Sequence, residues 1–151
     1  MRLKRRQWLP YRLEDVFQFF SDAHNLEQIT PPWLHFKILD QSTDQIGRGT
    51  VFDYKIRIRG LPIKWRSLIT QWNKGSDFVD VQIKGPYRVW HHTHRFFEYR
   101  NGTWIEDEIY YKPPVIPFIS ILIDAFVNRD VRVIFDYRQK TIEKIFKQKN
   151  N

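Results

Sequence analysis

Residues 103–138 read TWIEDEIYYKPPVIPFISILIDAFVNRDVRVIFDYR, and within this stretch the spacing of the apolar residues changes. Up to Tyr111, apolar and polar residues alternate, as they do in a β-strand with one buried face. Beyond Pro113-Pro114 the apolar residues recur at helical spacing. Proline favours a break at this point because it lacks the amide donor that a strand or helix needs. The stretch therefore predicts a strand followed by a long helix over residues 118–147.

The predicted helix carries one apolar stripe that Arg138 interrupts. The stripe consists of Val127, Val131, Ile134, Phe135, Ile142, Ile145 and Phe146. A helix of this kind gains most of its stability from packing its apolar side on another element. We therefore expect it to lie across a sheet.

Alternating segments upstream of the stretch supply that sheet. They cover residues 34–38, 52–58, 63–70, 78–83 and 89–99. The turns between them include Gly60-Leu61-Pro62, Gly85-Pro86 and the hairpin signal Arg100-Asn101-Gly102. Because successive strands are joined by short turns, the sheet is predicted to be antiparallel.

The chain before this sheet reads as one strand followed by helix. Residues 2–9 alternate weakly, and residues 13–29 show helical spacing that fits one amphipathic helix or two short ones. Pro31-Pro32 should end the helical region. The order of elements predicts an α+β fold, and the absence of a linker or repeat predicts a single domain over residues 1–151.

Composition excludes several classes of protein. The chain has no cysteine, so disulfides and thiolate metal sites are excluded, and we expect a cytoplasmic location. The apolar run of residues 115–127 is interrupted and is shorter than a membrane-spanning helix. The net charge of +8 is spread along the chain without a nucleic-acid motif, so no specific nucleic-acid partner is predicted.

Several motifs, taken together, resemble those of one bacterial branch of the START-like (SRPBCC) superfamily, which includes polyketide cyclase/dehydrase-like proteins. They are VFQFF at residues 16–20, ITPPWL at 29–34, FVDVQIKGPY at 78–87, WHHTHRF at 90–96 and FDYR at 135–138. The resemblance covers nearly the whole chain. It implies a helix-grip, Bet v 1-like fold in which a curved antiparallel sheet wraps around the C-terminal helix and leaves an internal cavity for an apolar ligand.

The segment around Trp90 holds the most informative polar residues. On a regular strand His92 and His94 share a face with Trp90, and across the hairpin Asp107 would share that face with Tyr111. Such a cluster fits a structural hydrogen-bond network, or orientation and acid–base work on a ligand. It also fits a metal. We predict neither a metal nor a cofactor, because a metal site normally has a further ligand and supporting hydrogen bonds, and the sequence names neither.

Other residues are predicted to surround the same cavity. Asp80 and Gln82 share one strand face, and either could pair with Arg138, which otherwise could anchor a ligand carboxylate or phosphate. Tyr54 and Trp65 would extend the aromatic wall. The predicted cavity set is Tyr54, Trp65, Asp80, Gln82, Trp90, His92, His94, Asp107, Tyr111 and Arg138.

The sequence supports three hypotheses for function. The first is binding of a small apolar or amphipathic molecule in the cavity, without catalysis. The second is an enzyme of the cyclase or dehydratase kind, with His92, His94 and Asp107 as the acid–base candidates. The third is a basic adaptor for an anionic membrane or another polyanion. No nucleophile motif is present, which disfavours a hydrolase with a covalent intermediate.

Overall fold

The computed structural model describes residues 1–115, 118 and 120–148 of the chain. Within these residues, seven strands and three α-helices follow the predicted order. They are β1 (Arg2–Leu9), α1 (Leu13–Phe20), α2 (Ala23–Ile29), the short 3₁₀ helix η1 (Pro32–Leu34), β2 (Lys37–Gln41), β3 (Val51–Ile58), β4 (Leu61–Asn73), β5 (Asp77–Lys84), β6 (Val89–Tyr99), β7 (Gly102–Lys112) and α3 (Ser120–Gln148).

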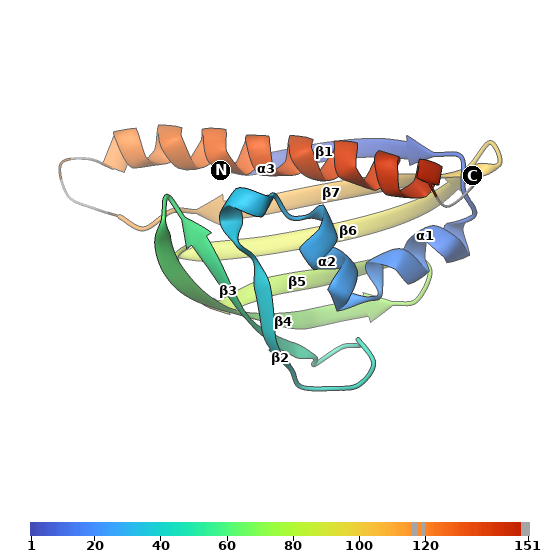
Figure 1. The fold of residues 1–151 in the computed structure, drawn as a ribbon, viewed down its shortest axis with the longest axis horizontal. Coiled ribbons are helices and arrows are strands. Elements are labelled where there is room, and N and C mark those ends of the chain that lie inside the picture. Colours follow the sequence, from blue (N-terminus) through green and yellow to red (C-terminus); the bar gives the residue numbers. More distant parts are fainter. Residues whose placement is uncertain (116–117, 119, 149–151) are drawn as a thin grey trace.

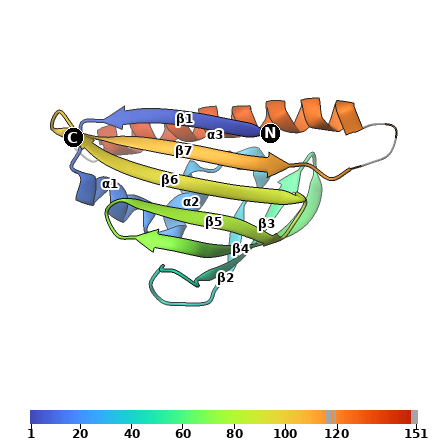
Figure 2. The same ribbon diagram turned by 180° about the vertical axis from the view of Figure 1, so that it is seen from behind.

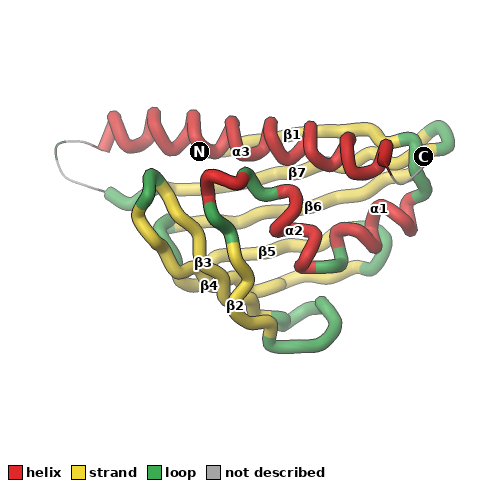
Figure 3. The backbone as a smooth tube through the Cα atoms, in the orientation of Figure 1, coloured by secondary structure: helices red, strands yellow, loops and turns green. Residues whose placement is uncertain are grey.

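The strands form one curved antiparallel sheet with the helices on its inner face. The strand order is β1-β7-β6-β5-β4-β3-β2, so the first strand lies beside the last. Figure 1 shows α3 running along the β1–β7 side of the sheet while α1 and α2 cover the middle strands. The strands lie in front of all three helices when the molecule is seen from behind (Figure 2). The tube drawing shows the same two layers (Figure 3).

The long C-terminal helix confirms the prediction made from the apolar stripe. Val131, Phe135, Ile142 and Phe146 are buried along it. Polar contacts also hold α3 to the sheet: Gln7 Nε2 on β1 donates to the Gln139 carbonyl oxygen at 2.8 Å. The helix begins at Ser120 rather than at Phe118, and residue 119 of the predicted range lies outside the described residues. No helix in the described part of the chain is long and apolar enough to cross a membrane.

The N-terminal helical region is two helices followed by a 3₁₀ turn. Asp22 starts the second helix, because its Oδ1 accepts a hydrogen bond from the His24 backbone N–H at 2.9 Å. The predicted strand at residues 34–38 begins only at Lys37, since Pro32 starts the 3₁₀ helix instead. Proline is well suited to a first helical position, where no amide donor is needed.

The hairpin between β6 and β7 forms where the sequence predicted it, but its glycine has another role. Arg100 and Asn101 adopt positive φ angles of 47° and 57° and make the turn. Gly102 is already the first residue of β7 and pairs with Tyr99. A Cβ at Gly102 would lie 2.5 Å from the Leu9 carbonyl oxygen. The glycine is therefore needed for the close approach of β1.

Candidate functional site

A cavity of about 190 Å³ lies between the inner face of the sheet and the helices. This volume is more than ten times the roughly 10–15 Å³ that one water molecule needs. Strands β2 to β6 supply about half of its wall, and α1, α2, η1, one turn of α3 and the adjoining loops supply the rest. The predicted alternation of β3 is confirmed, because Phe52, Tyr54, Ile56 and Ile58 all line the cavity.

Aromatic rings form one part of the wall. Trp65 stands edge-on to Trp90, with ring centroids 5.2 Å apart, and stacks beside Tyr54 at 5.9 Å. Ser67 fixes two of these rings: its Oγ lies 2.6 Å from the Tyr54 hydroxyl and accepts a bond from Trp65 Nε1 at 3.0 Å. Burial raises the pKa of Tyr54, so its hydroxyl stays protonated. This part of the wall is apolar and held in a fixed arrangement.

A cluster of two histidines and two aspartates, His92, His94, Asp80 and Asp107, forms the polar part of the site. Strand register brings it together: on β6, His92 pairs with Asp80 of β5, and His94 pairs with Asp107 of β7. The two imidazole rings are 3.7 Å apart between centroids. Each carboxylate therefore reaches both rings, one from each neighbouring strand.

Within the cluster, each of the two histidines contacts both aspartates. Asp107 Oδ1 is hydrogen-bonded to His92 Nε2 at 2.9 Å and lies 2.9 Å from His94 Nδ1. The second contact lacks hydrogen-bond geometry, so His94 Nδ1 has no hydrogen-bond partner. On the other side, Asp80 Oδ2 lies 3.4 Å from His92 Nδ1 and 3.3 Å from His94 Nε2.

The cluster lies among apolar groups. His92 is 3% exposed and His94 is 5% exposed. Phe78 stacks on His94 with ring centroids 4.1 Å apart, and Phe135 of α3 meets His92 edge-on. Burial acts to raise the pKa of Asp107, but the hydrogen bond from His92 and the close approach of the His94 ring outweigh it and hold that pKa far below its usual range. Asp80 behaves in the same way, so both aspartates are ionised.

Arg138 of α3 faces the same cavity from the opposite side. The side chain is 9% exposed, and its guanidinium lies over the Phe135 ring at 4.8 Å. Its Nε has no hydrogen-bond partner, and none of the ion pairs among the described residues joins Arg138 to a carboxylate. Burial lowers the pKa of Arg138, yet an arginine remains protonated in a protein. The cavity thus contains a buried cation that no carboxylate contacts.

Most of the predicted site residues are brought together, and three lie outside the cavity wall. Tyr54, Trp65, Asp80, Trp90, His92, His94 and Arg138 line it. Asp107 lies behind the histidines. Tyr111 packs against Trp90 and donates to Asn128 Oδ1 at 2.8 Å. Gln82 instead donates from Nε2 to the Tyr87 carbonyl oxygen at 2.6 Å and holds the turn between β5 and β6.

The N-terminal helices supply wall residues that the sequence interpretation missed. Phe19, Phe20, Leu26 and Ile29 all line the cavity. Their helical spacing was visible in the sequence, but it shows only that one side of the helices is buried. The neighbour against which they pack comes from the tertiary fold.

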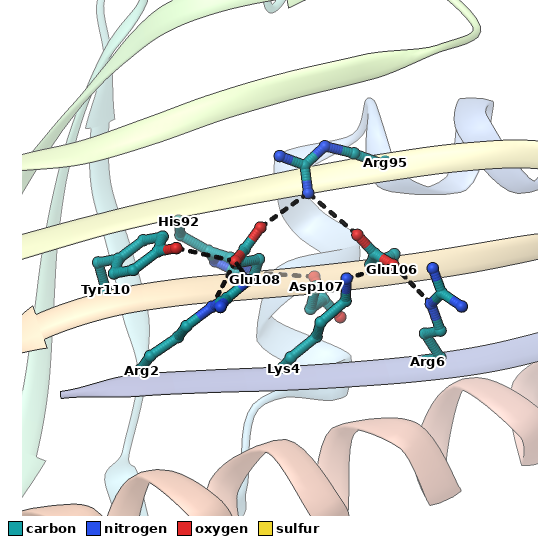
Figure 4. A network of polar contacts seen from close by, with 9 residues as sticks. All are labelled: Arg2, Lys4, Arg6, His92, Arg95, Glu106, Asp107, Glu108 and Tyr110. Carbon is teal, nitrogen blue, oxygen red and sulfur yellow. Dashed lines mark hydrogen bonds and ion pairs between the residues drawn. The ribbon is translucent and has the colours of Figure 1, made fainter.

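The outer face of the sheet carries an ion-pair ladder in which several Lys and Arg side chains are paired with carboxylates. Figure 4 shows Arg95 of β6 reaching both Glu106 and Glu108 of β7, with Nη1–O distances of 3.0 and 2.9 Å. Cations of β1 complete the ladder from the other side: Arg2 pairs with Glu108, and Lys4 pairs with Glu106 at 2.9 Å. These cations are already engaged by the protein's own carboxylates.

Comparison with known proteins agrees with the geometry. A sequence model of the family described as "Polyketide cyclase / dehydrase and lipid transport" matches residues 9–136. No curated protein sequence gave a significant match.

Solved structures similar to this chain share its fold at low sequence identity. The protein TTHA0849 from Thermus thermophilus superposes with a TM-score of 0.71 and 16% identity over 95% of both chains. A START superfamily protein from Mycobacterium smegmatis gives a TM-score of 0.66 and 9% identity over 95% of this chain and 98% of that one. The di-domain ARO/CYC StfQ of the steffimycin biosynthetic pathway gives a TM-score of 0.74 and 12% identity over 99% of this chain and 51% of that one. These likenesses show the START-like helix-grip fold.

Proposed function

The chain belongs to the polyketide cyclase / dehydrase and lipid transport family, and from this we propose that it binds a small, mainly apolar molecule in the cavity between its sheet and helices. The observation that carries the proposal is the wall itself. Aromatic and aliphatic side chains from nine elements meet around one space, and the polar groups gather at the histidine–aspartate cluster and Arg138. Sites of this composition bind apolar molecules and orient them by a few polar contacts.

The buried cation, Arg138, limits the chemical class of ligand that fits the cavity. A guanidinium that is removed from water needs an anion or several acceptors. Arg138 faces the cavity without a carboxylate at ion-pair distance in the described structure. We therefore assign to the site an amphipathic molecule whose carboxylate or phosphate meets Arg138 while its apolar body lies against Trp65 and Trp90.

A fluorescence titration with 1-anilinonaphthalene-8-sulfonate tests the binding proposal. The wild-type protein should show a saturable rise in probe fluorescence, and Trp90→Ala should weaken it because the variant removes part of the cavity wall. Trp33→Ala is the matched control, since Trp33 is half-exposed on η1 and does not line the cavity. An unsaturable signal in the wild type, or equal affinity in Trp90→Ala, would contradict the proposal.

A second candidate function, acid–base chemistry on the bound molecule, is favoured by the position of the histidines. His92 and His94 line the cavity and are backed by carboxylates, as groups that transfer protons are. Native mass spectrometry of protein purified without detergent can separate the two functions. A binder should carry the same small molecule in the wild type and in His94→Gln. A dehydratase should carry molecules that differ by the mass of one water.

Two expectations stay predictions. The first is that no specific nucleic acid binds, and the outer-face ladder supports it because its cations already contact Glu106 and Glu108. The second is the cytoplasmic location expected from the lack of cysteine.

A further inference from the structure

We propose that Asp80, His92 and His94 bind a divalent transition metal at the wall of the cavity. Each offers one ligand atom, and the three atoms lie within 4.8 Å of one another. Two imidazole nitrogens and one carboxylate oxygen form a ligand set typical of iron(II), cobalt(II) and zinc(II) sites that keep open positions.

The distances between the ligand atoms fit a shared ion better than direct hydrogen bonds. Asp80 Oδ2 lies 3.4 Å from His92 Nδ1 and 3.3 Å from His94 Nε2. Charge-assisted hydrogen bonds between such groups are normally about 2.7–2.9 Å long. Two ligands bound about 2.1 Å from one metal, at tetrahedral or octahedral angles, are separated by roughly 3.0–3.4 Å. The observed separations fall at the upper end of that interval.

Asp107 supplies the support that metal-bound histidines usually have. Its Oδ1 lies 2.9 Å from His92 Nε2 and 2.9 Å from His94 Nδ1, the two ring nitrogens that face away from Asp80. The hydrogen bond to His92 fixes which nitrogen of that ring carries hydrogen, and Asp107 is close enough to accept a hydrogen bond from His94 Nδ1 once a metal holds the other nitrogen of that ring. In the metal-bound form, the lone pairs of His92 Nδ1 and His94 Nε2 would point to the metal beside Asp80 Oδ2. A cation bound between these three ligand atoms would offset the repulsion among their electron pairs.

The cavity leaves room for the rest of the coordination sphere. Asp80, His92 and His94 all line it, whereas Asp107 lies behind the histidines. The protein ligands therefore approach from one side, and the positions toward the cavity stay free for water or for an oxygen of the bound molecule. Metal binding would use the imidazole lone pairs, so it is an alternative to proton transfer by the histidines.

Cobalt(II) and zinc(II) titrations of the chelator-treated full chain test the proposal without any organic ligand. The wild type should bind one equivalent of either metal, with visible cobalt absorption bands, and its melting temperature should rise with zinc. Asp80→Asn and His94→Gln should weaken binding at least about 100-fold, and Asp107→Asn by about 10–100-fold. The matched control is His91→Ala, because His91 is exposed on the opposite face of β6 and should leave binding unchanged.

The outcomes are decisive even if a variant folds poorly. Circular dichroism and thermal unfolding of each metal-free variant identify misfolded protein, and the wild-type titration stands alone. Absence of stoichiometric binding by the wild type would overturn the proposal. Weak binding that survives in folded Asp80→Asn, or that falls equally in His91→Ala, would overturn it too. The probe titration with anilinonaphthalene sulfonate is independent, so the apolar-ligand proposal can stand while the metal site fails.

Discussion

Asp107 and His92 form a buried pair, with Oδ1 and Nε2 2.9 Å apart and both residues no more than 5% exposed. Asp107→Asn keeps the shape of the side chain but leaves the imidazoles with a neutral partner. In the presence of a chelator we expect the variant to lose about 1–3 kcal/mol of unfolding free energy, measured by urea denaturation.

Asp53→Asn is the comparison for that experiment, because Asp53 pairs with Arg66 near the surface of the same sheet. Its loss of unfolding free energy should be much smaller than that of Asp107→Asn, since water screens exposed pairs. Equal losses of unfolding free energy in the two variants would show that burial does not strengthen the contribution of Asp107 to stability.

Arg138→Met should separate anionic from neutral ligands. Anilinonaphthalene sulfonate and N-phenyl-1-naphthylamine share one ring skeleton, and only the former carries a charge. Methionine keeps an unbranched apolar chain but cannot pair with an anion. We expect the affinity for the sulfonate to fall about tenfold or more, as loss of a charged hydrogen bond of about 1.5–3 kcal/mol implies. The affinity for the amine should change little. Parallel losses for both probes would assign Arg138 a packing role only.

Gly102→Ala should destabilise the protein by about 1–3 kcal/mol, because the new methyl group would press on the backbone of Leu9 and the ring of Trp8. Gly47→Ala is the matched control, since nothing lies within 4 Å of a Cβ at Gly47. That change should stay within about 0.5 kcal/mol. Thermal unfolding of both variants measures the difference, and a harmless Gly102→Ala would refute the close-packing explanation.

The ion-pair ladder should make stability depend on acid pH. The hydrogen bond from Arg95, helped by Arg2, lowers the pKa of Glu108 from 4.5 to about 2. Because the folded value is lower, the stabilising contribution is fully present above about pH 4.5 and is lost as the pH falls toward 2. Glu108→Gln should cost about 1 kcal/mol at pH 7, since the partners are partly exposed, and almost nothing near pH 2.

The control for the ladder is Glu98→Gln, which changes an exposed carboxylate of β6 that takes part in none of the ion pairs described above. Its unfolding free energy should follow the wild type at every pH. If the loss of unfolding free energy in Glu108→Gln does not become smaller at acid pH, the ion pairs of Glu108 are not its cause.

The periodic parts of the fold could be predicted from the sequence because periodicity reports burial directly. The alternation from Phe52 to Ile58 and the stripe from Val131 to Phe146 each identified a buried face that the structure confirms. The 3₁₀ turn at Pro32 was not predicted, because a proline that stops one helix is also well placed to start the next.

The part of the candidate site that lies on the β6–β7 hairpin could be predicted from the sequence. The contacts between β5 and β6 could not, because the turn between those strands has a weaker sequence signal. Asp107 was expected to share a face with the histidines because the hairpin at Arg100 and Asn101 fixes the register of β6 on β7. The pairing of Asp80 with His92 depends on the turn at Gly85. The Gln82 side chain fixes this turn by a hydrogen bond to the backbone. The sequence pattern predicted Asp80 at the cavity but could not reveal that register, so only the structure shows that Asp80 contacts the histidines rather than Arg138.

The pairing of β1 with β7 has a consequence for how the chain folds. Residues paired between the two strands are 94 to 108 positions apart, from Leu9–Thr103 to Arg2–Tyr110, so their contact closes a long loop at a large entropic cost. Strands β3 to β7 instead assemble through neighbouring hairpins. During synthesis β1 therefore leaves the ribosome long before its partner exists. Arg2, Lys4 and Arg6, the last of which pairs with Glu106 in the folded protein, then lie along an unpaired edge, where charge discourages association with other chains. We therefore expect the cations that later bind Glu106 and Glu108 to reduce aggregation of the nascent chain.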